Sequence, residues 1–154
     1  MLLTSARELE HSGAAIAPLF GTDAAVLDVP YAPGKWTGHQ VLLHLADTET
    51  VFHERLRRIL ASDRGLLVPF DMDGWATRLP ARSLPVMGAL FTATRAAIVE
   101  LAATLRPADL ARLGWHQARG EVTVPAQLRM IHWHADHHAT QVRAAIEGRV
   151  WVKV

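Results

Sequence analysis

Apolar residues recur at steps of three and four in four segments of the chain, the spacing that places them on one face of an α-helix. The clearest of these seams runs from Leu84 to Leu105. A chain of 154 residues has the usual size of one domain. We therefore predict an all-α four-helix bundle that occupies residues 1–154 as a single domain, with at least one long crossover connection. The four seams fall in residues 2–21, 37–59, 84–105 and 123–148.

Capping residues and prolines set the expected ends of the first three helices. The first helix is expected to end near Gly21. Thr37 is expected to be the N-cap of the second, because a threonine side chain accepts a hydrogen bond from the first turn. Ser83 is expected to cap the third helix, with Pro85 in its first turn and Pro107 closing it.

The segments between and after these helices show little helical periodicity. Residues 62–83 are predicted to form a long connection, and such a loop is usually functional or wraps the fold. Residues 115–124 predict a short strand or an extended loop. The fourth helix is expected to begin near Thr123 and to end before Gly148. The tail, residues 149–154, alternates and is expected to pack as a short strand.

The composition excludes several classes of protein. Sixteen basic and fifteen acidic residues give a net charge of +1, which argues against a nucleic-acid partner or an anionic membrane surface. The chain has no cysteine, which excludes disulfide scaffolds, iron–sulfur clusters and cysteine nucleophiles. The longest segment without charge or histidine is far shorter than a membrane span, and no secretory signal is visible. We expect a cytoplasmic protein with a small-molecule substrate, no membrane partner and, as one option, a homodimeric state.

Histidine is the most unusual feature of the composition. The chain has nine, and His132, His134, His137 and His138 fall within seven positions. His134 and His138 are four apart and lie on the same face of the last helix. Neighbouring apolar residues indicate that this face is buried, where an imidazole needs a partner for each ring nitrogen. This pair therefore predicts a metal site, with a hydrogen-bonded core histidine or an accidental cluster as the alternatives.

A third candidate ligand is His44, beside the apolar seam of the second helix. Two facing helices can bring His44, His134 and His138 to one point. Three imidazoles leave open positions on a tetrahedral or octahedral ion, an arrangement typical of a catalytic site. His137 is the main competitor, although it points about 100° away from His138. His53 lies about 13 Å along the helix from His44, too far to share an ion.

Two segments resemble the DinB-like superfamily: Trp36 followed by residues 44–49 (His-Leu-Ala-Asp-Thr-Glu), and residues 134–142 (His-Ala-Asp-His-His-Ala-Thr-Gln-Val). Residues 69–75 and 120–125 also fit, so the resemblance covers essentially the whole chain. It implies a DinB-like four-helix bundle with a divalent metal ion. The ion is expected to be zinc or nickel, with iron and manganese as alternatives. The implied ligands are His44, His134 and His138.

The resemblance also implies enzyme chemistry at this ion, which lowers the pKa of a bound water or thiol. The leading hypothesis is an S-transferase that uses a low-molecular-weight thiol such as bacillithiol or mycothiol, as some members of the family do. The alternatives are a hydrolase with a metal-bound water and a non-catalytic metal-binding bundle. Asp47 is the candidate catalytic residue, expected to orient a ligand or accept a proton, unless it is an exposed carboxylate. Gln141 is a weaker candidate to support the ligands, and Trp36 and Trp75 either line the pocket mouth or pack the bundle end.

Proton competition adds an expectation about pH. Imidazole has to be neutral to bind a metal, and its unperturbed pKa is about 6.5. Metal affinity is therefore expected to fall steeply as the pH drops through about 6.

Overall fold

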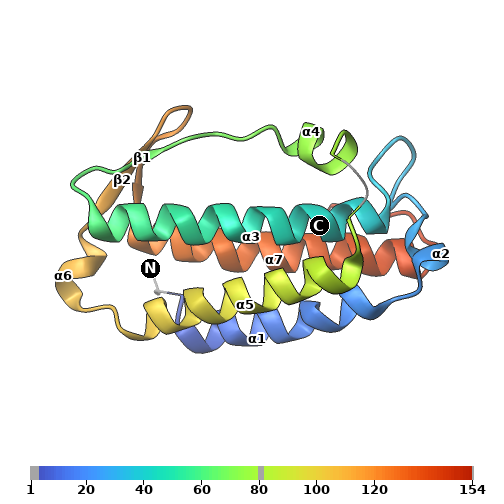
Figure 1. Cartoon of the computed structure of the whole chain (residues 1–154), viewed down its shortest axis with the longest axis horizontal. Coiled ribbons are helices and arrows are strands. Elements are labelled where there is room, and N and C mark those ends of the chain that lie inside the picture. Colours follow the sequence, from blue (N-terminus) through green and yellow to red (C-terminus); the bar gives the residue numbers. More distant parts are fainter. Residues whose placement is uncertain (1–3, 80–81, 154) are drawn as a thin grey trace.

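The chain forms the predicted four-helix bundle in a computed structural model that describes residues 4–79 and 82–153 (Figure 1). Figure 1 shows that α3 and α5 run in one direction and that α1 and α7 run in the other. Because α3 and α5 are consecutive long helices and parallel, the chain between them has to return along the bundle. The four long helices are α1 (Ala6–Ile16), α3 (Gly38–Ala61), α5 (Leu84–Ala103) and α7 (Val124–Ile146).

The returning segment is the predicted crossover, and its described residues, 62–79, run back along α3 (Figure 1). It contains β1 (Leu66–Leu67) and the short helix α4 (Met72–Thr77). Strand β1 pairs in parallel with β2 (Leu113–His116), which pairs antiparallel with β3 (Gly120–Thr123). The extended segment predicted before the last helix is therefore a β-hairpin. It ties the start of the crossover to one end of the bundle.

Capping contacts explain the limits of the two helices that carry most of the histidines. The Thr37 hydroxyl accepts a hydrogen bond from the Gln40 backbone N–H (3.2 Å), and the Gln40 side chain accepts one from the Thr37 N–H (2.9 Å). At the start of α7, the Thr123 hydroxyl accepts from the Ala126 N–H (3.3 Å). Gly148, just past the end of α7, has φ +63°, a conformation that favours glycine. The sequence therefore predicted these limits well.

Prolines lie at or just after the ends of α1 and α5. The α-helical part of the first helix ends at Ile16, and the chain continues as the 3₁₀ helix η1 (Ala17–Gly21), because Pro18 has no N–H for an α-helical bond. Helix α5 ends at Ala103, two residues before the end of the predicted seam at Leu105, and Pro107 follows it as predicted. The residue before a proline disfavours the helical region, and Arg106 is extended with ψ 162°. Two further short helices connect the bundle, α2 (Ala24–Leu27) and α6 (Pro107–Leu110).

The tail is also not the predicted strand, since its described residues, 149–153, contain none. The Trp151 backbone N–H donates to the Tyr31 carbonyl (2.7 Å), and its indole N–H donates to the Thr140 hydroxyl (2.8 Å). The three-stranded sheet lies at the other end of the bundle from the point where the tail leaves α7, so the tail has no sheet edge there to join (Figure 1). The first residues of the predicted first helix and the last residue of the tail lie outside the described residues.

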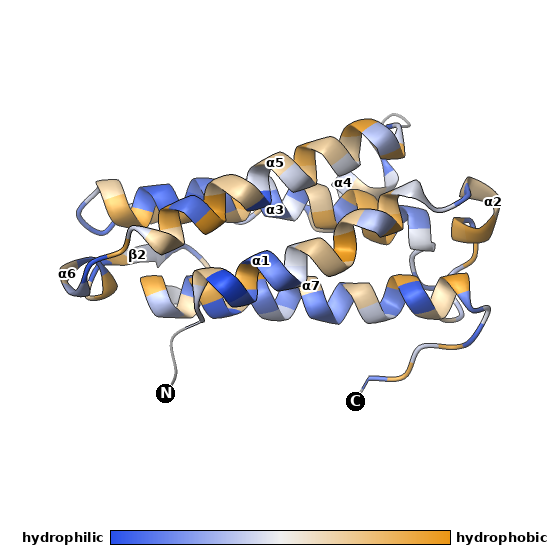
Figure 2. Cartoon of the chain, turned by 90° about the horizontal axis from the view of Figure 1, so that it is seen from below, coloured by the Kyte–Doolittle hydropathy of each residue, from blue (hydrophilic) through white to orange (hydrophobic). Residues whose placement is uncertain are grey.

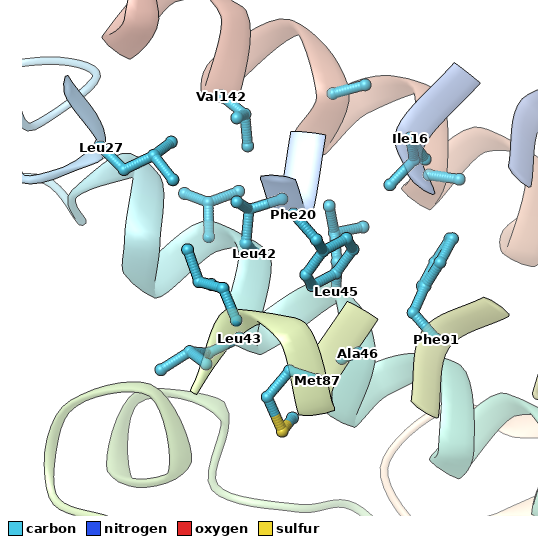
Figure 3. Close-up of a cluster of buried hydrophobic side chains, with 14 residues drawn as sticks. Ile16, Phe20, Leu27, Leu42, Leu43, Leu45, Ala46, Met87, Phe91 and Val142 are labelled. Atoms are coloured by element: carbon cyan, nitrogen blue, oxygen red, sulfur yellow. The ribbon is translucent and has the colours of Figure 1, made fainter. Parts of the chain in front are cut away.

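The bundle core consists of two apolar clusters, one toward each end. The first cluster surrounds Leu42, Leu45 and Phe91 (Figure 3). The second surrounds Leu56 and Leu128. A layer of buried polar side chains separates the two clusters. We call it the polar layer, and its members are Ser12 on α1, Thr48 and Glu49 on α3, Thr94 and Arg95 on α5, and His134 on α7.

The centre of the polar layer is an ion pair between Arg95 and Glu49, which are 4% and 1% exposed. Arg95 donates to both carboxylate oxygens of Glu49, from Nε (2.5 Å) and Nη2 (3.0 Å). Its Nη1 donates to the Leu9 carbonyl and the Ser12 hydroxyl, both at 2.8 Å. A Cβ atom at Gly13 would lie 2.6 Å from Arg95 Cγ, so glycine lets α1 approach. One guanidinium therefore joins three helices.

Helix α5 is, among the described residues, the one helix long and apolar enough to cross a membrane by length and composition. Figure 2 shows apolar residues along it. It packs against α1 and α3, however, and its Arg95 pairs with Glu49 on α3. These contacts bury one face of α5 against the bundle.

Removing one partner of the central ion pair should be costly. We predict that Glu49→Ala lowers the free energy of unfolding by about 3–5 kcal/mol, because it leaves the Arg95 charge buried and unpaired. Urea denaturation followed by circular dichroism measures this. Glu54→Ala is the matched control, since it breaks an exposed pair with Arg58 on the same helix and should cost about 1 kcal/mol or less. Equal losses in the two variants would contradict the prediction.

Candidate metal centre

His44, His134 and His138 come together between α3 and α7. The ring centroids lie 4.9 Å apart for His44 and His134, 4.7 Å for His44 and His138, and 4.4 Å for His134 and His138. One nitrogen from each ring can be chosen so that all three lie within 4.8 Å of one another. His44 and His134 are buried and His138 is half-buried. The tertiary structure therefore assembles the three histidines that the sequence singled out, which we call the histidine triad.

The shortest separation in the histidine triad is 2.9 Å, between Nε2 of His44 and Nε2 of His134. Two imidazole nitrogens about 2.1 Å from one ion would lie about 3.0 Å apart at the angle of about 90° in an octahedral site and about 3.4 Å apart at the tetrahedral angle. The observed separation therefore fits two ligands of a single ion. It also fits a hydrogen bond between the rings if one of them carries its proton on Nε2.

Gln141 determines which ring nitrogen of His138 carries the proton. Its side-chain oxygen lies 2.6 Å from Nδ1 of His138. An amide oxygen only accepts, so Nδ1 carries the proton and Nε2 keeps its lone pair for a ligand bond. The Gln141 amide nitrogen lies 3.3 Å from Nε2 of His137, to which it donates. The weak sequence candidate Gln141 is thus a direct partner of the triad.

Aromatic and hydroxyl groups surround the other two rings. The Trp36 ring lies 5.0 Å from that of His44, and the Phe52 ring lies edge-on to that of His134 at 5.1 Å. The Thr48 hydroxyl is 3.3 Å from Nδ1 of His44. Trp36 also packs against the first apolar cluster, so it combines the expected bundle-end packing with a contact to His44. Thr48 is therefore a polar neighbour of the triad.

Burial keeps the three imidazoles neutral. Desolvation, with a smaller effect of His138, lowers the pKa of His44 to about 3. Desolvation also lowers the pKa of His138 to about 4, although its hydrogen bond to Gln141 acts in the opposite direction. Desolvation and then the charge of His138 hold the pKa of His134 well below 6.5. Neutral imidazole is the form that binds metal, so competition from protons starts at lower pH than the sequence-based expectation of about 6.

Asp47 is buried, so the alternative of an exposed carboxylate is wrong. Its Oδ1 accepts a hydrogen bond from Arg82 Nη1 (2.6 Å), and Arg82 Nη2 donates to the Trp75 carbonyl (2.9 Å). Its Oδ2 is buried without a partner among the described residues. Asp47 lies outside the group of candidate ligand atoms. Because Arg82 bonds both Asp47 on α3 and Trp75 on α4, it ties the α4 region to α3. The Trp75 ring packs on that of Phe70, with ring centroids 4.8 Å apart.

Three other histidines, His132, His137 and His53, lie outside the triad. His137 stacks on Trp133, with ring centroids 4.8 Å apart and an angle of 20° between the planes. His132 faces Asp136, with Nε2 3.5 Å from the carboxylate. His53 lies outside the group of candidate ligands in the described structure, as its distance along the helix predicted.

A cavity of about 310 Å³ next to His134 was not foreseen from the sequence. Its wall includes Arg55, His116 and Arg119. Arg55 is not among the site residues that the sequence predicted. The sequence does contain one signal that Arg55 faces the cavity. Arg55 follows Phe52 by three residues, so the two side chains lie on the same side of α3.

The buried imidazoles predict how stability depends on pH. Without metal, the unfolded chain binds protons on His44, His134 and His138 near pH 6.5, whereas the folded protein resists protonation until about pH 4 at His138 and about pH 3 at His44. The unfolded state binds more protons between these values, so the free energy of unfolding should fall as the pH drops from about 6.5 to about 4, by up to about 1.4 kcal/mol per pH unit for each histidine. Urea denaturation of the metal-free protein at several pH values measures the slope. His44→Gln should reduce it, and an unchanged slope would contradict the assignment.

The chain is similar to several relatives along most of its length. One, from Bacillus mycoides, is 30% identical over 131 residues, which are 84% of this chain and 75% of the relative. Another, from Geobacillus thermodenitrificans, is 30% identical over 141 residues, which are 88% of this chain and 78% of the relative. Both are named as candidate metal-dependent hydrolases.

Two solved structures have a similar fold. YfiT from Bacillus subtilis, described as a candidate metal-dependent hydrolase with an unusual four-helix bundle topology, has a TM-score of 0.85 and 24% identity over 93% of this chain and 84% of its own. The four-helix bundle protein TT2238 has a TM-score of 0.61 and 29% identity over 90% of this chain and 94% of its own. Residues 8–142, which include the whole histidine triad, match the DinB superfamily. Together with the bundle topology, this match shows that the chain belongs to the DinB superfamily.

Proposed function

We propose that the protein is a metal-dependent hydrolase of a small molecule, with His44, His134 and His138 as the ligands of a divalent ion. The observation that carries the proposal is the convergence of three neutral imidazoles at one point, next to a cavity. The names of the relatives support hydrolysis as the reaction class. Zinc and nickel suit an imidazole site, and iron and manganese are the alternatives.

The donor set fits a catalytic ion better than a structural one. Three protein ligands leave at least one position for water or substrate, whereas a closed structural site has four. A divalent ion in such a site lowers the pKa of a bound water and polarises the bond to be cleaved. Gln141 holds the His138 ring with Nε2 free, and Trp36 shields His44 from solvent.

Asp47 is the proposed proton acceptor near this site. Arg82 binds Oδ1 and holds the carboxylate in place, while Oδ2 keeps its capacity to accept a proton or a hydrogen bond. Asp47 is one turn after His44 on α3, so both side chains project toward the same side of the helix.

The first test is metal content. We predict about one divalent ion per chain in protein purified without a histidine tag, measured by plasma mass spectrometry, and loss of the ion in the alanine variants of His44, His134 and His138. Gln141→Leu should weaken binding by about 10–100-fold, because it frees the His138 ring. His132→Ala is the control that should retain the ion. Retention in His138→Ala together with loss in His137→Ala would move the third ligand to His137.

The second test is turnover. We predict that the metal-loaded protein hydrolyses members of a panel of small esters, amides and lactones, and that a chelator or His44→Ala abolishes the activity. Asp47→Asn should lower kcat by about 100-fold or more while the ion is retained, because a general base contributes this much. Glu54→Gln, an exposed carboxylate on the same helix, is the control.

The same samples distinguish the other reaction classes. The chain has no cysteine, so a thiol nucleophile would have to come from a cofactor such as bacillithiol or mycothiol. Conjugation of either thiol to an electrophile, without hydrolysis, would replace the hydrolase by a thiol-dependent S-transferase. A metal-loaded protein that does neither would be a non-catalytic metal-binding bundle.

A further inference from the structure

The cavity next to the histidine triad has a positively charged wall. It lies between α3, the crossover, the β2–β3 hairpin and α7, and His134 and Thr48 form its boundary with the triad. No Asp or Glu of the described residues lines it. Its other polar side chains are Arg55, His116 and Arg119, and its apolar surface includes Phe52, Phe70, Met72 and Met130.

Arg55 has an unusual environment for a buried arginine. Arg55 and Arg95 are both 4% exposed, but only Arg95 has a carboxylate partner. Arg55 Nη2 donates to the Val68 carbonyl (2.8 Å), while its Nε has no partner in the described part of the chain. The neighbouring carboxylate of Glu54 is paired with Arg58. A guanidinium stays charged in a protein, so Arg55 brings to the cavity a positive charge that forms no ion pair with a carboxylate of the described residues.

The hairpin adds the guanidinium of Arg119 and the neutral imidazole of His116 to this wall. The Ala118 backbone N–H donates to Nδ1 of His116 (3.2 Å), so the imidazole proton sits on Nε2 and is available to an acceptor. Desolvation, then Arg119 and Arg55, lower the pKa of His116, which shows that the two arginines act on the same place. Arg119 is exposed and, like Arg55, pairs with no carboxylate among the described residues.

We propose that this cavity binds an anionic oxygen group, a carboxylate or a phosphate, of the small-molecule substrate, through Arg55, Arg119 and the Nε2–H of His116. Guanidinium groups bind both anions through paired hydrogen bonds. Phe52, Phe70 and Met130 contact the apolar part of the same molecule. The inference rests on the proposed function, because it places the anion beside His134 so that the rest of the substrate extends toward the triad.

Binding of simple aromatic probes to the full-length protein tests the proposal. Benzoate, phenylphosphonate and the neutral isostere benzamide are titrated by calorimetry into metal-free protein, which prevents the anions from binding to an ion at the triad. We expect at least one of the two anions to bind about 10-fold or more tightly than benzamide, since hydrogen bonds to charged groups contribute this much. The stronger of benzoate and phenylphosphonate identifies the class of anion.

Substitutions locate the binding site. Arg55→Met keeps most of the side-chain length and should reduce anion affinity by about 10-fold or more without a matching loss for benzamide. Arg119→Met, at an exposed position where folding is not at risk, should reduce it several-fold. Arg57→Met is the control, because Arg57 is exposed on the same helix and does not line the cavity. If Arg55→Met fails to fold, the comparison of the anions with benzamide and the Arg119→Met variant still test whether the cavity binds an anion.

Equal binding of the anions and benzamide would overturn the anion site, as would affinities that neither Arg55→Met nor Arg119→Met changes. Metal binding and anion binding distinguish failure of the proposed function from failure of the anion site. His44 does not line the cavity, so His44→Ala should lose the metal ion and keep anion binding. A protein that binds benzoate through Arg55 but binds no metal would contradict the hydrolase alone. A protein that binds metal and hydrolyses neutral esters without preferring anions would contradict the anion site alone.

Discussion

The buried ion pair between Arg95 and Glu49 is the constraint on which the rest of the bundle depends. An unpaired charge in this position would be strongly destabilising, so the helices have to meet with the pair and its partners aligned. Arg95 reaches α1 through Leu9 and Ser12 and α3 through Glu49, which fixes the relative positions of three helices. Apolar packing alone tolerates shifts along a helix far better than such a network does.

This alignment also positions the histidine triad. His44 lies five residues before Glu49 on α3, so the contacts that hold Glu49 set the height of His44 in the bundle. His134, in the same polar layer, faces it from α7 with its Nε2 2.9 Å away. The layer between the two apolar clusters therefore contains both the structural ion pair and part of the candidate metal centre.

The sequence predicted much of the fold and of the candidate site, for local reasons. Periodicity identified four helices, and caps at Thr37 and Thr123 located the starts of α3 and α7. The spacing of His134 and His138 placed both on one face of a helix. The sequence did not predict the partner of Asp47. Arg82 is 35 positions away from Asp47 in the chain, and the two meet only because of the path of the crossover. The α-helical part of the first helix ends before the predicted Gly21 because Pro18 lacks an N–H, whereas Pro107 closes the third helix as predicted.

The sequence by itself determined the elements and the chemistry available to them: four amphipathic helices, no cysteine, and an excess of histidine on one buried face. Only the tertiary structure decided which groups meet. It brought His44 to His134 and His138, left His137 to stack on Trp133, and placed Arg55 in a cavity wall with His116. The physical reason is that periodicity reports the direction of a side chain around its own helix. Contacts between segments far apart in the sequence depend on how helices are aligned along one another and on the path of the crossover, neither of which has a local pattern.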